Sequence, residues 1–281
     1  MRRKRVILWL AALLLVASFT AGQLRLSVSR YDCPVAGLPD DFEGYRIVQL
    51  SDLHGASFGK ENRRLVDRVR RENPDIIVLT GDFIEDAGDL PVTGRLLPEL
   101  TKIAPCYFVS GNHEVRHKKL DEYKEIVASC GVTVLDGTHT KMAISALSTE
   151  PDIYGFDDVT AYKDITEQIA HMEQTTQNYH FEESFNVLLV HRPEYIEQYA
   201  KLGFDLVLCG HAHGGQWRIP GVLNGIYAPG QGLFPKYDGG LYTKDDTNMV
   251  VSRGVGNSLF PFRVNNRPEI VLVELRGEEN D

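Results

Sequence analysis

The stretch FDLVLCGHAHGG, residues 204–215, joins an apolar run to two histidines and three glycines. Residues 204–209 are typical of a buried β-strand, and His211 and His213 follow directly after it. Alternate side chains of a strand point to the same face, so we expect the two imidazoles to share a direction. Shared direction is what a metal ion requires of its ligands. A pair of this kind can also be purely structural, so the rest of the chain has to decide between the two.

Four other apolar runs in the chain end in polar residues of the same kind. They are YRIVQLSD (45–52), DIIVLTGD (75–82), CYFVSGNHE (106–114) and FNVLLVHRPE (185–194). In open α/β sheets, ligands bind beyond the carboxyl ends of the strands, so all five strand ends can meet at one edge. Eight side chains then become candidates for one site: Asp52, His54, Asp82, Asn112, His113, His191, His211 and His213.

Amphipathic segments separate the expected strands. Apolar stripes at helical spacing predict helices near residues 61–71, 90–102, 120–127 and 162–172. Short strands are expected late in the chain, at 217–219, 240–242, 249–252 and 270–274. Strands that alternate with helices predict an α/β domain, and the late strands indicate a second sheet or a β-rich closure.

The candidate ligands combine carboxylate, amide and imidazole groups, without a thiolate. This set suits Mn²⁺, Fe²⁺ or Zn²⁺ better than the all-oxygen sites that Mg²⁺ and Ca²⁺ prefer. Seven ligands are too many for one ion, whereas two divalent ions that share a bridging carboxylate would use them all. Two metals about 3.5 to 4 Å apart form a clamp for in-line attack at phosphorus.

The composition excludes several other classes of function. A net charge of −9 over 281 residues argues against nucleic-acid binding, which usually needs a basic face. An acidic protein that handles phosphate needs local positive charge, and metal ions supply it. The 4 cysteines form no C-x-x-C pair, and the chain has no G-x-S-x-G motif, which disfavours a serine hydrolase. We expect a monomer.

The N-terminal sequence differs from the rest of the chain. MRRKR precedes residues 6–21, an uncharged and mostly apolar run that suits a signal peptide or a membrane anchor. We expect an uncleaved single-pass anchor in residues 1–24, a polar linker and lead-in over 25–44, and a catalytic domain over 45–281. The basic residues should stay cytoplasmic, which places the domain at the cell membrane on the extracytoplasmic side.

Five short motifs together resemble the signature of the calcineurin-like metallophosphoesterases, in the same order along the chain. The motifs are Asp52-Leu53-His54, Gly81-Asp82, Gly111-Asn112-His113-Glu114, His191, and Gly210-His211-Ala212-His213. GHAHGGQWRIP (210–220) and residues 252–270 further resemble the bacterial membrane-associated phosphodiesterases related to YkuE and YaeI. The resemblance implies a four-layer sandwich of two mixed β-sheets flanked by helices.

The resemblance also implies a role for each residue. Asp52, His54 and His213 would hold one metal ion, and Asn112, His191 and His211 would hold the other. Asp82 would bridge the two ions, water between them would attack phosphorus, and His113 would stabilise the transition state or protonate the leaving oxygen. Many relatives carry Gly-Asp-x-x-Asp, whose second aspartate orients this histidine. Here Glu85 stands at that position, so its catalytic role is an expectation only.

The expected activity is therefore hydrolysis of a phosphate ester, and the anchor suggests a phosphodiester on a lipid or cell-envelope component. One alternative is a UDP-2,3-diacylglucosamine-type pyrophosphatase of lipid A synthesis, whose substrate faces the cytoplasm. Another is a non-catalytic, metal-binding surface module, which would have no use for His113. Arg253 and Arg263 either contact an anionic substrate or are exposed to solvent.

Overall fold

The computed structural model describes residues 25–117, 119–142, 151–177, 185–219, 221–257 and 262–277. The expected membrane anchor, residues 1–24, lies outside these ranges. Within them, no helix combines the length and the apolar character that a membrane crossing requires.

The first sheet has six strands among the described residues, in the order β1-β14-β2-β3-β4-β5. Strands β2 to β5 run parallel, β14 is antiparallel to β2, and β1 is parallel to β14. The strands span Ser27–Val35 (β1), Arg46–Leu50 (β2), Ile76–Thr80 (β3), Cys106–Val109 (β4), Thr133–Val134 (β5) and Glu269–Gly277 (β14).

The second sheet, again within the described ranges, has the order β12-β13-β9-β8-β7-β6. Its four central strands are parallel, and β6 and β12 are antiparallel edges. The strands span Thr138–Lys141 (β6), Asp152–Gly155 (β7), Asn186–Leu189 (β8), Leu206–Cys209 (β9), Gly240–Lys244 (β12) and Thr247–Val251 (β13). A two-stranded ribbon, β10 (Tyr227–Ala228) with β11 (Gly232–Leu233), follows β9 in the chain.

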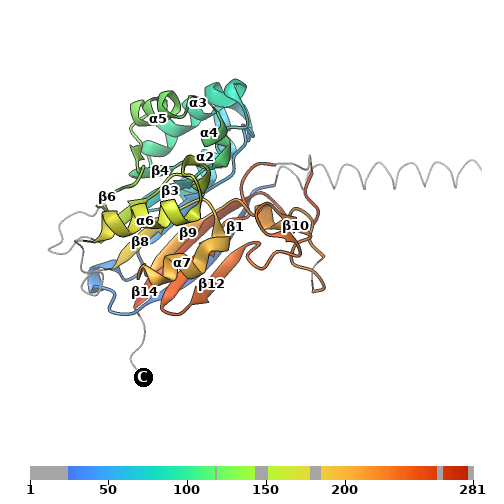
Figure 1. Cartoon of the computed structure of the whole chain (residues 1–281). Coiled ribbons are helices and arrows are strands. Elements are labelled where there is room, and N and C mark those ends of the chain that lie inside the picture. The colour runs from blue at the N-terminus through green and yellow to red at the C-terminus, as the bar shows by residue number, and fades with distance from the viewer. Residues whose placement is uncertain are drawn as a thin grey trace, which may run out of the picture.

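Helices cover the outer face of each sheet, so the molecule has four layers (Figure 1). The first sheet is covered by α2 (Arg63–Arg71), α3 (Leu90–Thr101) and α5 (Leu120–Ser129), and the short α4 (Asn112–Arg116) follows β4. The second sheet is covered by α6 (Ile165–Thr176) and α7 (Ile196–Lys201). Short 3-10 turns are η1 (Asp40–Phe42), η2 (Lys60–Asn62), η3 (Ala87–Asp89), η4 (Val159–Ala161), η6 (Pro193–Tyr195) and η7 (His213–Gly215).

Alternation along the central strands produces three separate cores. In β3, Ile77 faces the helices of the first layer, whereas Val78 faces the other sheet. In β9, Leu208 packs between the sheets, whereas Val207 packs under α6 and α7. Successive side chains of a strand point to opposite faces, so strands that are apolar throughout must be buried on both sides. The predicted α/β architecture with two mixed sheets and flanking helices is confirmed.

Two expectations about secondary structure are wrong. Residues 27–35, within the expected linker 25–44, form strand β1, which pairs along its whole length with β14. Its polar residues obscure an alternation in which Val28 faces the helical layer and Cys33 faces the other sheet. Residues 217–219 are not a strand and make only isolated bridges through Trp217 and Ile219. Helix α7 and strand β7 were not anticipated, because both are too short for a clear periodic pattern.

Candidate metal centre

The strands that carry the candidate ligands end at one common edge of the two sheets. Gln49 of β2 fixes this edge from inside the core. Its Nε2 donates to Thr80 Oγ1 (2.9 Å) on the neighbouring strand and to the Cys209 carbonyl (2.8 Å) on the other sheet. The carboxyl ends of β2, β3 and β9 are thereby held together by a fully buried amide. The residues that follow these strands must meet in the same small volume.

Asp52, His54 and His213 form the first group of facing side chains. One ligand atom from each lies within 4.8 Å of the other two. His54 Nε2 is 3.2 Å from His213 Nε2, and His213 Nε2 is 3.2 Å from Asp52 Oδ1. All three side chains are almost completely buried.

Asp82, His191 and His211 form the second group, with the same 4.8 Å criterion satisfied. His191 Nε2 is 3.1 Å from Asp82 Oδ2 and 3.2 Å from His211 Nδ1. Asn112 is buried beside them, and its Oδ1 has no hydrogen-bond partner among the described residues. Buried polar atoms are rarely left unpaired, so this amide oxygen, in the same cleft as Asp82 and His211, is available as a cation ligand.

Asp82 lies between the two groups. Its Oδ2 is 3.1 Å from His191 Nε2 and 3.8 Å from His54 Nε2, while its Oδ1 accepts a hydrogen bond from the His113 backbone N–H (2.8 Å). The carboxylate is held in place through one oxygen, and the other faces histidines of both groups. This is the position that a bridging carboxylate has to occupy.

The backbone at the ligands is strained. Five of the seven expected ligands adopt a positive φ, a region that non-glycine residues rarely occupy. The strain is local to sharp turns that re-aim the side chains as soon as each strand ends, and such strain concentrates at functional sites. The five are Asp52 (53°), His54 (45°), Asp82 (54°), His211 (66°) and His213 (49°).

This geometry corrects one expectation from the sequence. β9 ends at Cys209, so His211 and His213 lie beyond the strand and do not share a face through strand alternation. The turns direct His211 to Asp82 and His191, and His213 to Asp52 and His54. One H-x-H pair therefore supplies both groups. Gly210 permits the close approach to β2 because a side chain there would overlap the Ser51 hydroxyl and the Asp52 carboxylate.

The electrostatic environment of the centre favours the binding of positive charge. Burial alone would lower the pKa of His191, yet the carboxylates of Asp82 and Asp52 raise that pKa to about 10. Burial and the neighbouring His191 charge lower the pKa of His211 to about 3. Buried carboxylates that attract protons onto one imidazole are equally ready to bind a divalent cation, which replaces the proton. The donor set, the orphaned amide oxygen and the charge balance all fit bound divalent metal ions.

Hydrogen bonds fix the orientation of two imidazoles. His191 Nδ1 donates to the Thr80 carbonyl (2.7 Å), which leaves its Nε2 free to act as a ligand. His54 Nδ1 pairs with Glu85 Oε2 at 2.6 Å in the same way. The same oxygen lies 3.4 Å from His113 Nδ1. Glu85 thus reaches both histidines, and it is closer to His54 than to His113, its expected partner.

Glu114 belongs to the supporting structure, although its role was not predicted. Its fully buried carboxylate accepts backbone N–H groups from the turn after β3 and from the start of α4. Burial and the neighbouring Asp82 charge raise its pKa to about 7. The only sequence signal was its place after Asn112-His113. The four donors are Gly111 (2.7 Å), Asp82 (2.8 Å), Phe83 (2.6 Å) and Ile84 (3.1 Å).

The two arginines for which substrate contact or solvent exposure was expected have other partners. Arg253 pairs with buried Glu269 (Nη2 to Oε1, 2.6 Å). Arg263 is almost fully buried, donates to the Arg253 carbonyl (2.6 Å) and supports His213 Nδ1 from behind at 3.4 Å. Neither lines the cleft at the metal centre, whereas Arg116 and Arg192 do. The sequence pattern did not indicate that Arg116 and Arg192 line the cleft beside the ligands.

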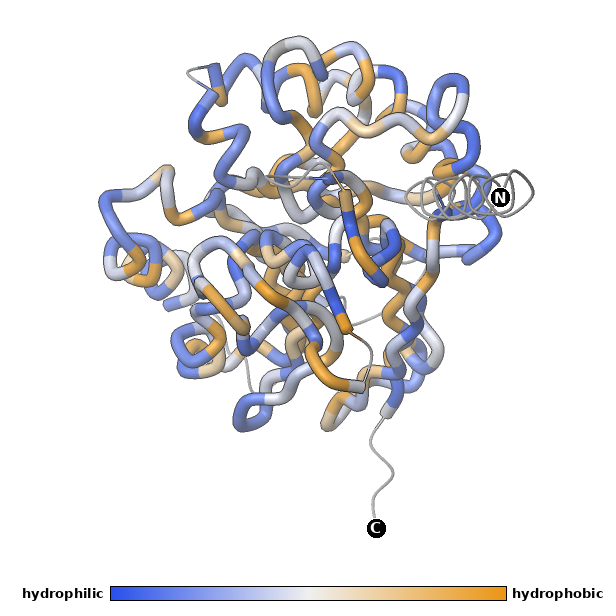
Figure 2. The backbone as a smooth tube through the Cα atoms, turned by 90° about the vertical axis from the view of Figure 1, so that its right-hand side faces the viewer, coloured by the Kyte–Doolittle hydropathy of each residue, from blue (hydrophilic) through white to orange (hydrophobic). Residues whose placement is uncertain are grey.

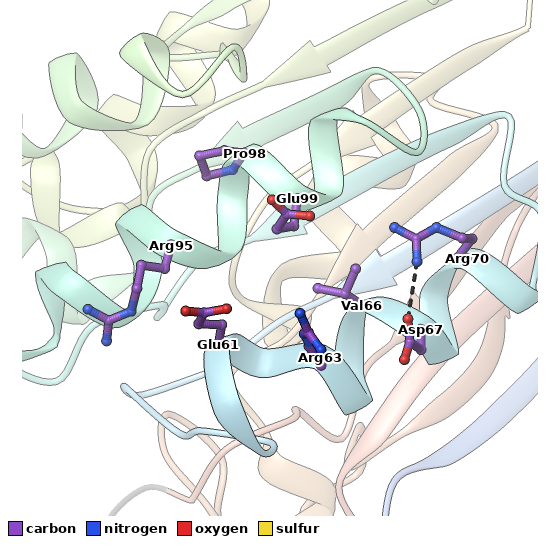
Figure 3. Close-up of a pocket in the computed structure, with 8 residues that line it drawn as sticks. All are labelled: Glu61, Arg63, Val66, Asp67, Arg70, Arg95, Pro98 and Glu99. Atoms are coloured by element: carbon purple, nitrogen blue, oxygen red, sulfur yellow. Dashed lines mark hydrogen bonds and ion pairs between the residues drawn. The ribbon is translucent and has the colours of Figure 1, made fainter.

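A cleft of about 410 Å³ opens over the centre and is lined by Asp82, Glu85, Asn112, His113, Arg116, Arg192, His211, His213, Tyr227, Pro229 and Gly230. A larger cavity of about 600 Å³ lies between α2 and α3 (Figure 3). Its charged side chains are of both signs, and one pair, Arg70 with Asp67, is already joined at 3.1 Å. Size therefore does not identify the site, whereas the chemistry of the lining does.

Comparisons with known proteins agree with this geometry. The family model for the calcineurin-like phosphoesterases matches residues 45–215. The uncharacterized metallophosphoesterase YkuE of Bacillus subtilis is 28% identical over 248 residues, which is 85% of this chain and 82% of YkuE. The phosphodiesterase YaeI of Escherichia coli is 28% identical over 250 residues, 86% of each chain. A metallophosphoesterase of Aquifex aeolicus is 29% identical over 264 residues, 91% of this chain and 94% of its own. The expected resemblance is confirmed.

Proposed function

Because the chain belongs to the calcineurin-like phosphoesterase family and is thus a metal-dependent phosphoester hydrolase, we propose that it hydrolyses phosphodiesters at a centre of two divalent cations. The observation that supports this most is the position of Asp82 between two groups of ligand atoms. A single cation would occupy only one of these two groups of buried, facing nitrogen and oxygen atoms.

In this proposal, Asp52, His54 and His213 hold one cation. Asn112, His191 and His211 hold the other, and Asp82 contacts both. Manganese, iron or zinc suit this mixture of oxygen and nitrogen donors. When bound, the cations neutralise the phosphoryl oxygens and lower the pKa of a bound water molecule.

The remaining chemistry belongs to side chains of the cleft. His113 lies in the cleft beside Asp82, and its side chain is 19% exposed. An imidazole in this position holds a proton that can pass to the leaving oxygen. Glu85 Oε2, 3.4 Å from His113 Nδ1, is placed to orient this imidazole in the cleft. Arg116, three residues further along α4, presents an exposed guanidinium to the same cleft and suits an anionic substrate oxygen.

The N-terminal sequence narrows the proposed class of substrate. An apolar run over residues 6–21 after MRRKR suits an anchor, so we place the enzyme at the cell membrane, with its domain on the extracytoplasmic side and a lipid or envelope component as the diester. YaeI, which covers most of the chain at 28% identity, is named a phosphodiesterase, which supports the preference for diesters.

A substrate panel tests this proposal. The metal-loaded full-length chain should hydrolyse bis(p-nitrophenyl) phosphate faster than the corresponding monoester, and lipid-linked diesters in vesicles faster than soluble ones. Equal rates on lipid-linked and soluble diesters would remove the support for the narrower substrate class. Preference for a lipid pyrophosphate, together with a cytoplasmic C-terminus in a topology assay, would favour the sugar-nucleotide pyrophosphatase alternative. No turnover on any phosphoester would contradict the catalytic assignment itself.

A further inference from the structure

The large exposed hydrophobic side chains of the described residues all come from one part of the chain. Ile219 is 50% exposed, Val222 82%, Leu233 67% and Phe234 65%, and Phe262 follows at 36%. We call the first four the apolar lip. Single exposed apolar residues are common on protein surfaces. Several from consecutive loops form an apolar patch of the kind that marks an interaction site.

Backbone hydrogen bonds join these loops into one body. Phe234 N–H donates to the Ile226 carbonyl (2.8 Å), and Ile226 N–H donates to the Trp217 carbonyl (3.2 Å). Trp217 in turn stacks on Phe262, with ring centroids 5.4 Å apart. The lip is therefore a connected surface and not a set of independent loop tips. Phe234 adopts a φ of 57°, an unusual conformation for a bulky residue.

The lip lies at the edge that carries the metal centre. Tyr227, Pro229 and Gly230, between the two halves of the lip, line the cleft together with His211 and His213. In Figure 1 the loops around β10 project from the side of the molecule on which β1 begins, and Figure 2 looks onto that side, where apolar and polar stretches alternate.

The chain also enters the domain at this edge. β14 is antiparallel to β2, so β14 begins beside the end of β2 that leads to Asp52. β1 is parallel to β14, with Ser27 opposite Glu269, and therefore begins at the same edge. Residues 1–24 contain the apolar run and connect to the domain at Arg25. A membrane that holds the N-terminal segment would adjoin the edge with the lip and the cleft.

The charge distribution suits an anionic lipid surface. The chain has 39 Asp and Glu residues, yet none lies in residues 211–237 or 247–268, the segments that form the lip and its surroundings. Where the chain enters, Arg25 lines a shallow cavity with Arg64, Arg68 and Arg71, and Asp67 is the one acidic residue among the described lining residues. An acidic protein is repelled by anionic lipids, and segments without Asp or Glu weaken that repulsion where they meet the bilayer.

We propose that the apolar lip inserts into the interface of a membrane that contains anionic lipids and so holds the mouth of the metal cleft against the bilayer. None of the four lip residues is among the described residues that line the metal cleft, so this role is separate from catalysis. The bilayer, and not a second copy of the chain, is the partner, because the chain's own N-terminal sequence leads to it at the same edge.

Trp217 provides a direct probe of insertion. The chain has 2 tryptophans, Trp9 and Trp217. In a full-length Trp9→Phe variant, Trp217 is the only source of indole fluorescence. We reconstitute this variant into vesicles of phosphatidylglycerol and phosphatidylcholine that carry a nitroxide high on the acyl chain. Insertion predicts a blue shift and loss of more than half of the Trp217 emission, with weaker quenching by a nitroxide near the bilayer centre.

A combined lip variant in the same background, with Ile219→Ser, Val222→Ser, Leu233→Ser and Phe234→Asn, should lose the quenching. A matched control with Ile219→Leu, Val222→Leu, Leu233→Met and Phe234→Leu keeps the apolar surface and should retain it. Hydrolysis of a soluble diester should be equal in both variants, which separates this test from the proposed activity. If the combined variant folds poorly, Val222→Ser alone, at the most exposed position, should still reduce the quenching.

Two results would overturn the inference. One is a vesicle-bound chain whose Trp217 emission is unaffected by either nitroxide. The other is disulfide dimerisation of a Val222→Cys variant in vesicles, accompanied by absence of quenching, which would assign the lip to contact between two copies. A chain that does not bind vesicles at all would contradict both the lip and the proposed anchor.

Discussion

His54 and His213, which are separated by 159 positions in the chain, face each other with their Nε2 atoms 3.2 Å apart. Two imidazole nitrogens at this distance are arranged for a common partner. Asp52 Oδ1, 3.2 Å from His213 Nε2, completes the set on the side of the first sheet. The contact joins β2 of one sheet to β9 of the other through the turns that follow them. A cation bound here would therefore couple metal binding to the docking of the two sheets.

Replacement of His113 with Ala should reduce turnover by about 100- to 10,000-fold, the usual contribution of a general acid. Metal content should stay near that of the wild type, because the hydrogen bond from His113 to Asp82 comes from the backbone N–H, which the substitution keeps. Steady-state kinetics and elemental analysis of the same preparation check both statements. Loss of metal together with activity would mean that His113 is a ligand.

Removal of the Glu85 carboxylate, by Glu85→Ala, should weaken metal binding about 10- to 100-fold, the usual effect of a lost ligand-orienting partner. The reason is the 2.6 Å contact to His54 Nδ1, which is shorter than the 3.4 Å contact to His113. Metal titration followed by activity measures the effect. Unchanged metal affinity with a lower kcat would instead assign Glu85 to His113.

Glu114→Gln should destabilise the fold by about 2 to 4 kcal/mol, because the new amide N–H₂ group would face backbone donors that now share a buried carboxylate. Denaturant unfolding of the metal-free protein measures the change, and metal affinity should fall as the Asp82 turn loosens. Glu122→Gln is the control, since Glu122 makes only an exposed pair with Lys119. Equal stability of the two variants would refute this role for Glu114.

Removal of the metals should lower the thermal stability as well as abolish activity. Asp52 and Asp82 are buried and would remain without their cations. A ligand present at about 1,000 times its Kd stabilises the folded state by about 4 kcal/mol. Thermal unfolding with chelator, and again after addition of Mn²⁺, should show a reversible loss. An unchanged Tm would indicate that the centre contributes nothing to the fold.

Asp205 should make the stability depend on pH away from the metal centre. Burial raises its pKa to about 6, although its carboxylate accepts a hydrogen bond from the Asn186 backbone N–H (2.7 Å). A carboxyl whose folded pKa is raised favours the fold in its protonated form. Its stabilisation is present at low pH and is lost as the pH rises from about 4 through 6. The Asp205→Asn variant should therefore have a free energy of unfolding that exceeds the wild-type value by on the order of 1 kcal/mol at pH 8 and equals it at pH 4. Urea unfolding at the two pH values measures this difference.

Much of this fold could be predicted from local patterns. The five strands that lead into the centre, and helices α2, α3, α5 and α6, all lie within a few residues of the predicted ranges. Their apolar patterns are long and are buried on defined faces. The edge strand β1 was missed because one of its edges has no partner strand among the described residues, and polar residues interrupt its pattern. Short elements such as β7 depend on neighbours that are distant in sequence.

The site residues were named from their positions after strands, yet their geometry could not be derived. Strand alternation placed His211 and His213 on one face, whereas positive φ values direct them to different groups. Glu114 and Arg116 carried no signal beyond their neighbours in sequence, because their roles depend on which turns approach in space. Arginine is usually found at the protein surface, so the burial of Arg263 behind His213 follows only from tertiary contacts.

Anomalous X-ray scattering from crystals of the manganese-loaded chain tests the central claim most directly. We predict two peaks, one among Asp52, His54 and His213 and the other among Asn112, His191 and His211, with Asp82 in contact with both. A single peak, or two peaks without Asp82 between them, would contradict the binuclear centre on which the proposed activity rests.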